Sequence, residues 1–262
     1  MSPTVVGVSL KAYLGVAETT LWVRQLRDRL RLSQASIFVC LPYPMLAVGI
    51  AKLAGSGIGV GSQDVSRFGP GPHTGEVPAE MLAELGAGYI EVGHAERRIE
   101  QGETDAEVAE KVRRCGQVGL TPVICVGEAE KTVAGQAARS TVAQLRRRLE
   151  RYESGAPLIV AYEPEWAISA AQAAEPAAVR DVVGQLRALL NDRGLQGSVL
   201  YGGSATAGTY LALCDDAIQS PTQPDGLFIG RAALDVTRLG AIVDEVTHAG
   251  SAEERTLGGN TN

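Results

Sequence analysis

Lysine, histidine and cysteine are scarce in this chain, and long apolar runs are absent. Its 262 residues include four lysines, three histidines and four cysteines. No apolar run approaches the length of a membrane span, and the N-terminus lacks the charged-then-apolar layout of a signal peptide. We therefore expect a cytoplasmic protein with no membrane partner. The scarcity also leaves few candidates for any role that needs a lysine or a histidine.

The charge and the cysteine spacing exclude further classes. The net charge is −6 and no basic stripe offsets it, which argues against a nucleic-acid partner. The cysteines form no C-x-x-C pair, and Cys40 and Cys125 stand in short apolar segments. This pattern favours reduced, buried thiols over disulfides or metal ligands. We expect no metal and no cofactor.

Short apolar segments alternate with helical segments eight times along the chain. We expect strands at 5–10, 37–41, 58–62, 89–93, 122–126, 158–161, 198–201 and 225–229. The alternation predicts an α/β fold, a single-domain (β/α)8 barrel over residues 1–248, because this architecture typically takes about 250 residues. The last helix is expected to end near Val246, and the small, polar residues 249–262 are expected to form a frayed tail. A doubly wound sheet would carry a glycine fingerprint after its first strand, where Ser9-Leu10-Lys11 stands.

Three reactive side chains stand where expected strands end. Lys11 follows the first strand and His94 the fourth, and Glu163 follows the sixth, directly before Pro164. The carboxyl ends of barrel strands meet at one mouth. Taken one at a time, each has an ordinary structural explanation: Lys11 in an ion pair at the barrel rim, His94 as a residue of a turn, and Glu163 as a solvated acid. Together they predict a catalytic site.

Side-chain alternation along a strand extends this prediction to neighbouring residues. It places Lys11 on the face of Ser9, and His94 on that of Val92. By the same count Glu91 faces away from the barrel interior, toward the helices. A buried carboxylate needs a partner, so we expect an arginine from a flanking helix, in a structural role.

Several longer segments resemble one family. The signature segments of triosephosphate isomerase are similar to 74–76, 93–98, 125–128, 161–168 and 201–204. The resemblance implies proton shuttling between adjacent carbons of a small sugar phosphate through an enediolate. It makes Glu163 the base, His94 a neutral hydrogen-bond donor and Lys11 a fixed positive charge paired with Glu96.

The resemblance also assigns a phosphate site, a lid and a subunit contact. Glycine-rich turns after the seventh and eighth strands match the recurring phosphate site of the barrel, although such turns are often plain turns. The long loop 63–76 resembles a segment inserted beside a neighbouring subunit's active site, which implies a homodimer; an exposed mobile loop is the alternative. The expected phosphate-binding residues are Ser169, Gly202, Gly203, Ser204, Gly230 and Arg231; the expected lid residues are Pro164, Trp166 and Ile168; the expected dimer-loop residues are Thr74, Gly75 and Glu76.

Four departures from the family pattern bear on the substrate. Ser9 stands where asparagine is usual, Ala95 replaces a serine, Ser169-Ala170-Ala171 alters the lid, and Arg231 replaces a glycine. Ser9 enlarges the substrate pocket, and with Arg231 it resembles a branch that interconverts L-erythrulose 1-phosphate and D-erythrulose 4-phosphate.

Three alternatives to a tetrulose phosphate isomerase stay open. The first is a triosephosphate isomerase that converts dihydroxyacetone phosphate to glyceraldehyde 3-phosphate. The second is a Schiff-base aldolase, for which Lys11 is the sole candidate lysine. The third is a phosphosugar-binding barrel without catalytic activity.

Overall fold

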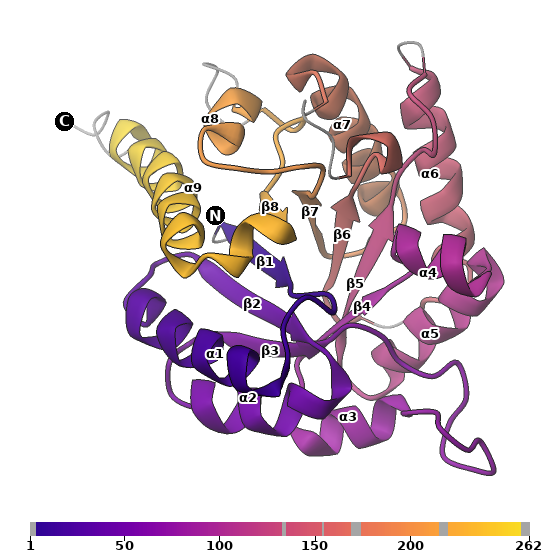
Figure 1. The fold of residues 1–262 in the computed structure, drawn as a ribbon. Coiled ribbons are helices and arrows are strands. Elements are labelled where there is room, and N and C mark those ends of the chain that lie inside the picture. Colours follow the sequence, from indigo (N-terminus) through magenta and orange to yellow (C-terminus); the bar gives the residue numbers. More distant parts are fainter. Residues whose placement is uncertain (1–3, 133–134, 154, 169–173, 215–219, 258–262) are drawn as a thin grey trace.

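Eight parallel strands follow one another around a closed barrel, and β1 pairs with β8 to complete it (Figure 1). This computed structural model describes residues 4–132, 135–153, 155–168, 174–214 and 220–257. The strands are β1 (Val5–Ser9), β2 (Ser36–Leu41), β3 (Gly59–Ser62), β4 (Tyr89–Val92), β5 (Thr121–Val126), β6 (Leu158–Tyr162), β7 (Gly197–Tyr201) and β8 (Gly226–Ile229). Each overlaps the strand expected from the sequence, so the single-domain (β/α)8 prediction is confirmed.

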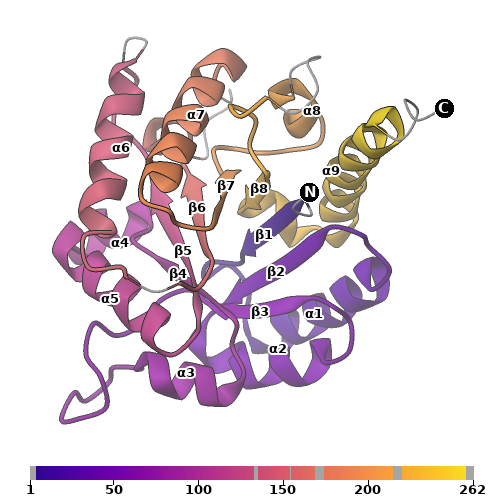
Figure 2. The same cartoon turned by 180° about the vertical axis from the view of Figure 1, so that it is seen from behind.

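Helices surround the barrel and cover its outer face (Figure 2). The α-helices are α1 (Val16–Leu30), α2 (Leu46–Leu53), α3 (Ala79–Leu85), α4 (Ala95–Gln101), α5 (Asp105–Gln117), α6 (Gln136–Arg148), α7 (Pro176–Asp192), α8 (Thr209–Leu213) and α9 (Val236–Leu257). Short 3-10 helices lie at Tyr43–Met45, Glu165–Ala167 and Arg231–Leu234. All three follow the carboxyl ends of strands, namely β2, β6 and β8, within three residues.

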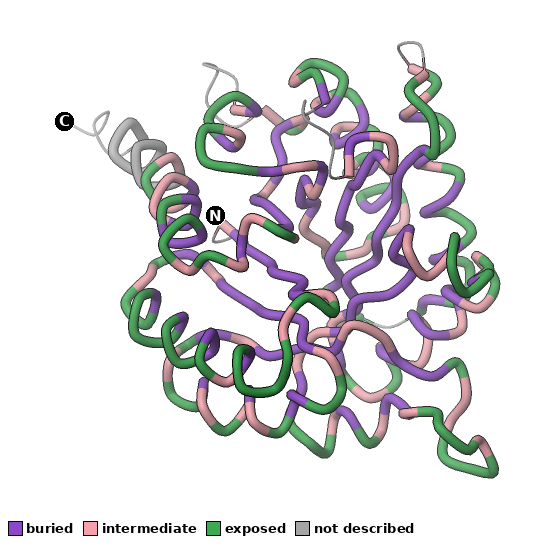
Figure 3. The backbone as a smooth tube through the Cα atoms, viewed as in Figure 1, coloured by how far each residue is buried: buried purple, intermediate pink, exposed green. Residues whose placement is uncertain are grey.

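Two apolar layers hold the barrel together. One lies between strands and helices, and the other fills the barrel interior. Figure 3 shows that the barrel strands are buried along most of their length. In the interior, Phe38 of β2 stacks on Tyr89 of β4 with ring centroids 4.4 Å apart, and the centroid of the Phe228 ring of β8 lies 6.1 Å from that of Phe38. Burying one such aromatic side chain stabilises the fold by about 2–3 kcal/mol. The interior is therefore a packed floor, and ligands can enter only above it.

The last helix differs from expectation. We expected it to end near Val246 and the chain to fray after His248, but α9 continues to Leu257. Small and polar residues such as Ala252 and Glu254 are compatible with helix, so their polarity was a poor indicator of its end. Among the helices of the described ranges, none combines the length and apolar character needed to cross a membrane.

Candidate functional site

Lys11 reaches the barrel mouth from a strained turn after β1. Its φ is +47°, in the left-handed region that non-glycine residues rarely occupy. Gln63 steadies this turn, because its Nε2 donates to the carbonyl oxygen of Lys11 over 3.0 Å. Strain of this kind costs on the order of 1 kcal/mol and gathers at functional sites.

The ammonium of Lys11 is paired with Glu96 of α4. Nζ lies 2.6 Å from Oε1 of Glu96. Burial alone would lower the pKa of Lys11, but the hydrogen bond and charge of Glu96, with the charges of Glu163 and Glu91, outweigh it and raise the pKa. Lys11 therefore stays protonated, as a fixed cation requires, and the pairing implied by the resemblance is present.

His94 is buried at the start of α4 and holds a defined orientation. Its Nδ1 accepts a hydrogen bond from the backbone N–H of Glu96 over 3.1 Å. A ring nitrogen that accepts carries no proton, so the neutral ring bears its proton on Nε2. That Nε2 lies 3.5 Å from Oε2 of Glu163. His94 thus presents a donor toward the mouth.

The direction of the His94 side chain does not follow from side-chain alternation along β4. Val92 packs in the layer between strands and helices, so strict alternation would turn His94 outward too. Gly93 has φ +72° and ends the alternation, which turns His94 to the mouth. We expected His94 at this site for the wrong geometric reason.

Glu163 follows β6 and is 7% exposed. Its Oε2 is buried and has no hydrogen-bond partner among the residues that the structure describes. Gly202 at the end of β7 leaves room for this carboxylate, because a Cβ there would lie 2.7 Å from Cγ of Glu163. An unpaired, poorly hydrated carboxylate oxygen is poised to accept a proton.

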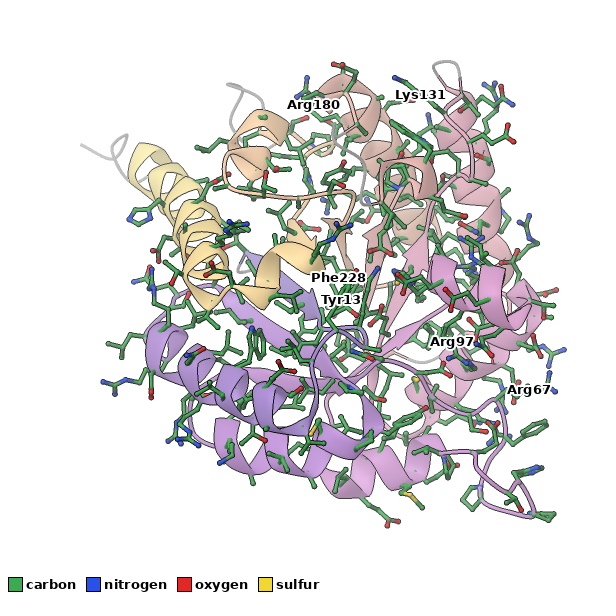
Figure 4. The ribbon with its side chains drawn as sticks, viewed as in Figure 1. Tyr13, Arg67, Arg97, Lys131, Arg180 and Phe228 are labelled. Atoms are coloured by element: carbon green, nitrogen blue, oxygen red, sulfur yellow. The ribbon has the colours of Figure 1, made fainter. Side chains whose placement is uncertain are left out.

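A cavity of about 370 Å³ opens beside this carboxylate. Predicted residues that line it are Ser9, Lys11, Glu163, Ile168, Gly202, Ser204, Gly230 and Arg231. Gly203 does not line it and instead packs against Tyr201 and Pro164. Ser169 lies outside the described residues. Tyr13, Phe228 and Arg238 also line the cavity and were not anticipated; Figure 4 labels Tyr13 and Phe228 near the centre of the barrel.

Contacts from other segments hold the first residues of the expected lid, around Trp166, in place. Pro164 is the second residue after β6, and the indole N–H of Trp166 donates to Oε1 of Glu128 over 2.8 Å. Glu165 pairs with Arg98, and the ammonium of Lys131, labelled in Figure 4, lies 5.3 Å from the centre of the Trp166 ring. Sequence reasoning missed these contacts. The one signal available was Glu128, a carboxylate just after β5.

The expected dimer loop projects from the barrel between β3 and α3 (Figures 1 and 2). Thr74, Gly75 and Glu76 are exposed on it and line neither cavity of the mouth. The loop is internally ordered, since Phe68 stacks on His73 at 4.2 Å and Arg67, labelled in Figure 4, covers the Phe68 ring.

A second cavity of about 340 Å³ lies on the other side of Ser9 and Lys11. His94 and Glu96 line it, as do Tyr43, Gln63, Asp64, Glu91 and Arg97. Arg97, labelled in Figure 4, pairs with Asp64 over 2.7 Å at its rim. No set of three or more His, Cys, Asp or Glu side chains in the described ranges is arranged to hold a metal ion.

Glu91 points into the barrel, so the expectation that it faces the helices was wrong. Tyr89, two residues earlier, packs in the interior layer, and alternation gives Glu91 the same direction. Its partner is not a helix arginine but Ser9, whose hydroxyl donates to Oε2 over 2.7 Å. Burial raises the pKa of Glu91 to about 7, and the charge of Glu163 adds to the rise.

Comparisons with known proteins agree with this geometry. The triosephosphate isomerase family model matches residues 4–246. An L-erythrulose-1-phosphate isomerase of Pectobacterium atrosepticum is 38% identical over 250 residues, which cover 91% of this chain and 94% of that protein. A triosephosphate isomerase of Thermus thermophilus is 37% identical, with 90% and 96% covered, and one of Bordetella pertussis is 38% identical, with 86% and 90% covered. The chain therefore belongs to the triosephosphate isomerase family.

Proposed function

We propose that this chain is a cofactor-independent isomerase that interconverts L-erythrulose 1-phosphate and D-erythrulose 4-phosphate through an enediolate. The observation that carries the proposal is the juxtaposition of three different groups at one mouth. A protonated lysine, a histidine that presents its Nε2 and a carboxylate oxygen without a hydrogen bond lie together, although Lys11, His94 and Glu163 are far apart in the chain.

The reaction needs a base that works on both carbons of the substrate. Glu163 takes the proton from C3 of L-erythrulose 1-phosphate, and the C–H electron pair forms a double bond to C2. The carbonyl oxygen on C2 becomes an oxyanion, which the ammonium of Lys11 and Nε2–H of His94 stabilise. The hydroxyl proton on O3 passes to O2, and Glu163 returns its proton to C2. The carbonyl then stands on C3, and no oxidant or reductant is consumed.

The phosphate is proposed to bind at the opposite wall of the larger cavity. Gly202, Ser204 and Gly230 line this wall without bulky side chains, and the guanidinium of Arg231 adds a cation for the phosphate. Lys11 lines the same cavity and is shared between the phosphate and the reacting oxygen. Remote binding of this kind holds the small reacting part in place.

Two observations bear on the number of carbons. Ser9 is short and stands between the two cavities, which leaves room for one more hydroxymethyl group. The Pectobacterium relative is named as acting on L-erythrulose 1-phosphate. The alternative is dihydroxyacetone phosphate, because the Thermus and Bordetella relatives named triosephosphate isomerases are equally similar.

We also propose that the chain functions as a homodimer. The projecting loop around Thr74 is exposed although its stacked Phe68 and His73 give it a fixed form. The second cavity, which lies beside Lys11 and is lined by charged residues, is the site where we place the loop of the other copy; we call it the socket. Glu76 on the loop and Arg97 at the socket rim carry opposite charges, so two copies related by a two-fold axis can each insert the loop into the other.

The decisive experiment compares kcat/KM for L-erythrulose 1-phosphate and dihydroxyacetone phosphate with the same purified protein. We expect a clear preference for the four-carbon substrate. A preference for the three-carbon substrate would instead establish a triosephosphate isomerase. Borohydride trapping with either ketose phosphate tests the aldolase alternative, which requires a stable adduct at Lys11.

Glu163→Gln tests the base itself. The amide has nearly the same shape but cannot accept the carbon-bound proton, so we expect kcat to fall by about 10²–10⁴-fold. Binding of 2-phosphoglycolate, measured by calorimetry, should stay within a few-fold of wild type. Wild-type protein should also introduce solvent deuterium into the substrate, and a protein that binds without exchanging deuterium would be a non-catalytic barrel.

A further inference from the structure

Ser9 and Glu91 form a polar pair on the floor of the mouth that the isomerisation step does not use. The Ser9 hydroxyl donates to Glu91 Oε2 over 2.7 Å, and Ser9 is the one hydrogen-bond partner of this carboxyl group in the described part of the chain. Glu91 is only 3% exposed. A carboxyl group with one protein partner has capacity for further hydrogen bonds.

The surroundings of Glu91 give no structural reason for an acid. Its register neighbour on β5 is Val123, and Cys40 of β2, another apolar side chain of the barrel interior, lies close to it. Burying a carboxyl group among them costs free energy unless its polar atoms are satisfied. An apolar side chain at this position would avoid that cost. The acid is therefore better explained by a ligand than by packing.

The position of the pair relative to the phosphate site defines which part of a ligand it meets. Gly202 and Gly230 mark the phosphate wall of the larger cavity, while Glu91 lines the smaller one. Ser9 and Lys11 line both. A ketose phosphate that places its phosphate at Gly230 and its reacting carbons beside Lys11 directs its far end toward Ser9 and Glu91.

We propose that Ser9 and Glu91 form a subsite for the terminal hydroxymethyl group of a four-carbon ketose phosphate, which makes Glu91 a specificity-determining residue. The hydroxyl on C4 donates to the Glu91 carboxylate or accepts from its protonated form, and Ser9 fixes the carboxyl group. A three-carbon substrate ends before this point and leaves the subsite to water. The inference rests on the proposed function and names the part of the substrate that decides it.

The first test measures a ratio of specificities in Glu91→Leu. Losing a hydrogen bond to a charged or partly charged group should lower the ratio of kcat/KM for L-erythrulose 1-phosphate over dihydroxyacetone phosphate by roughly 10- to 100-fold. Glu91→Gln keeps a polar group and should restore part of the ratio. Tyr89→Phe, the other inward polar side chain of β4, is the matched control and should leave the ratio at its wild-type value. An unchanged ratio in Glu91→Leu would overturn the proposal.

The second test separates this subsite from the reaction. Erythritol 4-phosphate and glycerol 3-phosphate lack a carbonyl and cannot isomerise, so calorimetry reports their binding alone. We expect wild type to bind erythritol 4-phosphate more tightly, and Glu91→Leu and Ser9→Ala to remove that difference. If wild type turned over only dihydroxyacetone phosphate but kept this Glu91-dependent difference, the proposed function would fail and the subsite would stand. Equal binding of both ligands by wild type would reject the subsite whatever the enzyme turns over.

Discussion

Two carboxyl groups in the mouth have different partners, and this difference assigns them different roles. Glu163 has a buried oxygen without a partner in the described ranges, and His94 Nε2 lies 3.5 Å away. Glu91 is bonded to Ser9 and lies deeper, on the strand itself. The first arrangement suits a base that must take up and release a proton. The second suits a group that recognises a hydroxyl.

Glu91 should also make the stability of the protein depend on pH. Burial raises its pKa from 4.5 to about 7, with Glu163 adding to the rise and His94, Ser9 and Lys11 opposing it. Between these pH values the folded state holds a proton that the unfolded state has released, so the free energy of unfolding falls as pH rises. The contribution of Glu91 to the free energy of unfolding is therefore complete below about pH 4.5 and is lost as the pH rises to about 7. The total loss is on the order of 3 kcal/mol.

Glu91→Gln should remove this dependence. We expect chemical denaturation to show that the wild-type protein loses more stability than Glu91→Gln between pH 5 and pH 8. The other titrating groups are shared, so the difference between the two proteins isolates Glu91. Glu84→Gln makes the same chemical change at an exposed position of α3 and should follow wild type. Parallel curves for wild type and Glu91→Gln would contradict the assignment.

At the scale of elements, the junction of β4 and α4 is held by α6. Arg148 of α6 is fully buried, and its Nη1 donates to the carbonyl oxygens of Gly93, over 3.1 Å, and Cys125. Its Nε donates to Asp105 over 2.8 Å. A helix arginine thus reaches the active-site strands, but it binds the backbone beside His94 and not Glu91. Arg148 thereby holds the backbone of the residue that precedes His94.

Replacing Arg148 should destabilise the protein far more than replacing its neighbour. Arg148→Met leaves the buried carbonyls of Gly93 and Cys125 without their donor, so we expect a loss of about 3 kcal/mol or more in unfolding free energy. Arg147→Met is the matched control, because Arg147 pairs with the same Asp105 over 2.7 Å but is 59% exposed. Its loss should stay below about 1 kcal/mol. Similar losses of unfolding free energy in the two variants would contradict the prediction that the buried arginine contributes more than the exposed one.

For the whole molecule, the sequence predicted what depends on periodicity and missed what depends on turns. Apolar strand segments, each followed by a helix, were sufficient for the barrel and for the residues at its mouth. The direction of Glu91, the turn at Gly93 and the clasp of Trp166 by Glu128 depend on backbone angles and contacts between distant segments. The extent of α9 was missed because Gly250 and Ser251 interrupt the pattern, although the Ala, Glu and Arg residues at 252–255 are good helix formers.

The projecting loop carries Thr74, Gly75 and Glu76, which line neither cavity of the mouth in their own chain, and its proposed role in the homodimer contact can be tested by reversing one charge. If Glu76 of one copy enters the socket lined by Arg97 of another, Glu76→Arg places like charges together and should weaken association. We expect sedimentation velocity to show twice the 27.4 kDa chain mass for wild type and mainly the single-chain mass for Glu76→Arg.

Activity should follow the same change, because the socket includes Lys11, His94 and Glu96 and an empty socket leaves them open to water. Turnover of Glu76→Arg should therefore fall and recover as protein concentration rises. Glu150→Arg makes the same substitution at an exposed position after α6, away from the loop, and should sediment and react as wild type does. A wild-type chain that sediments as a monomer at every concentration and is fully active would show that the loop serves another purpose.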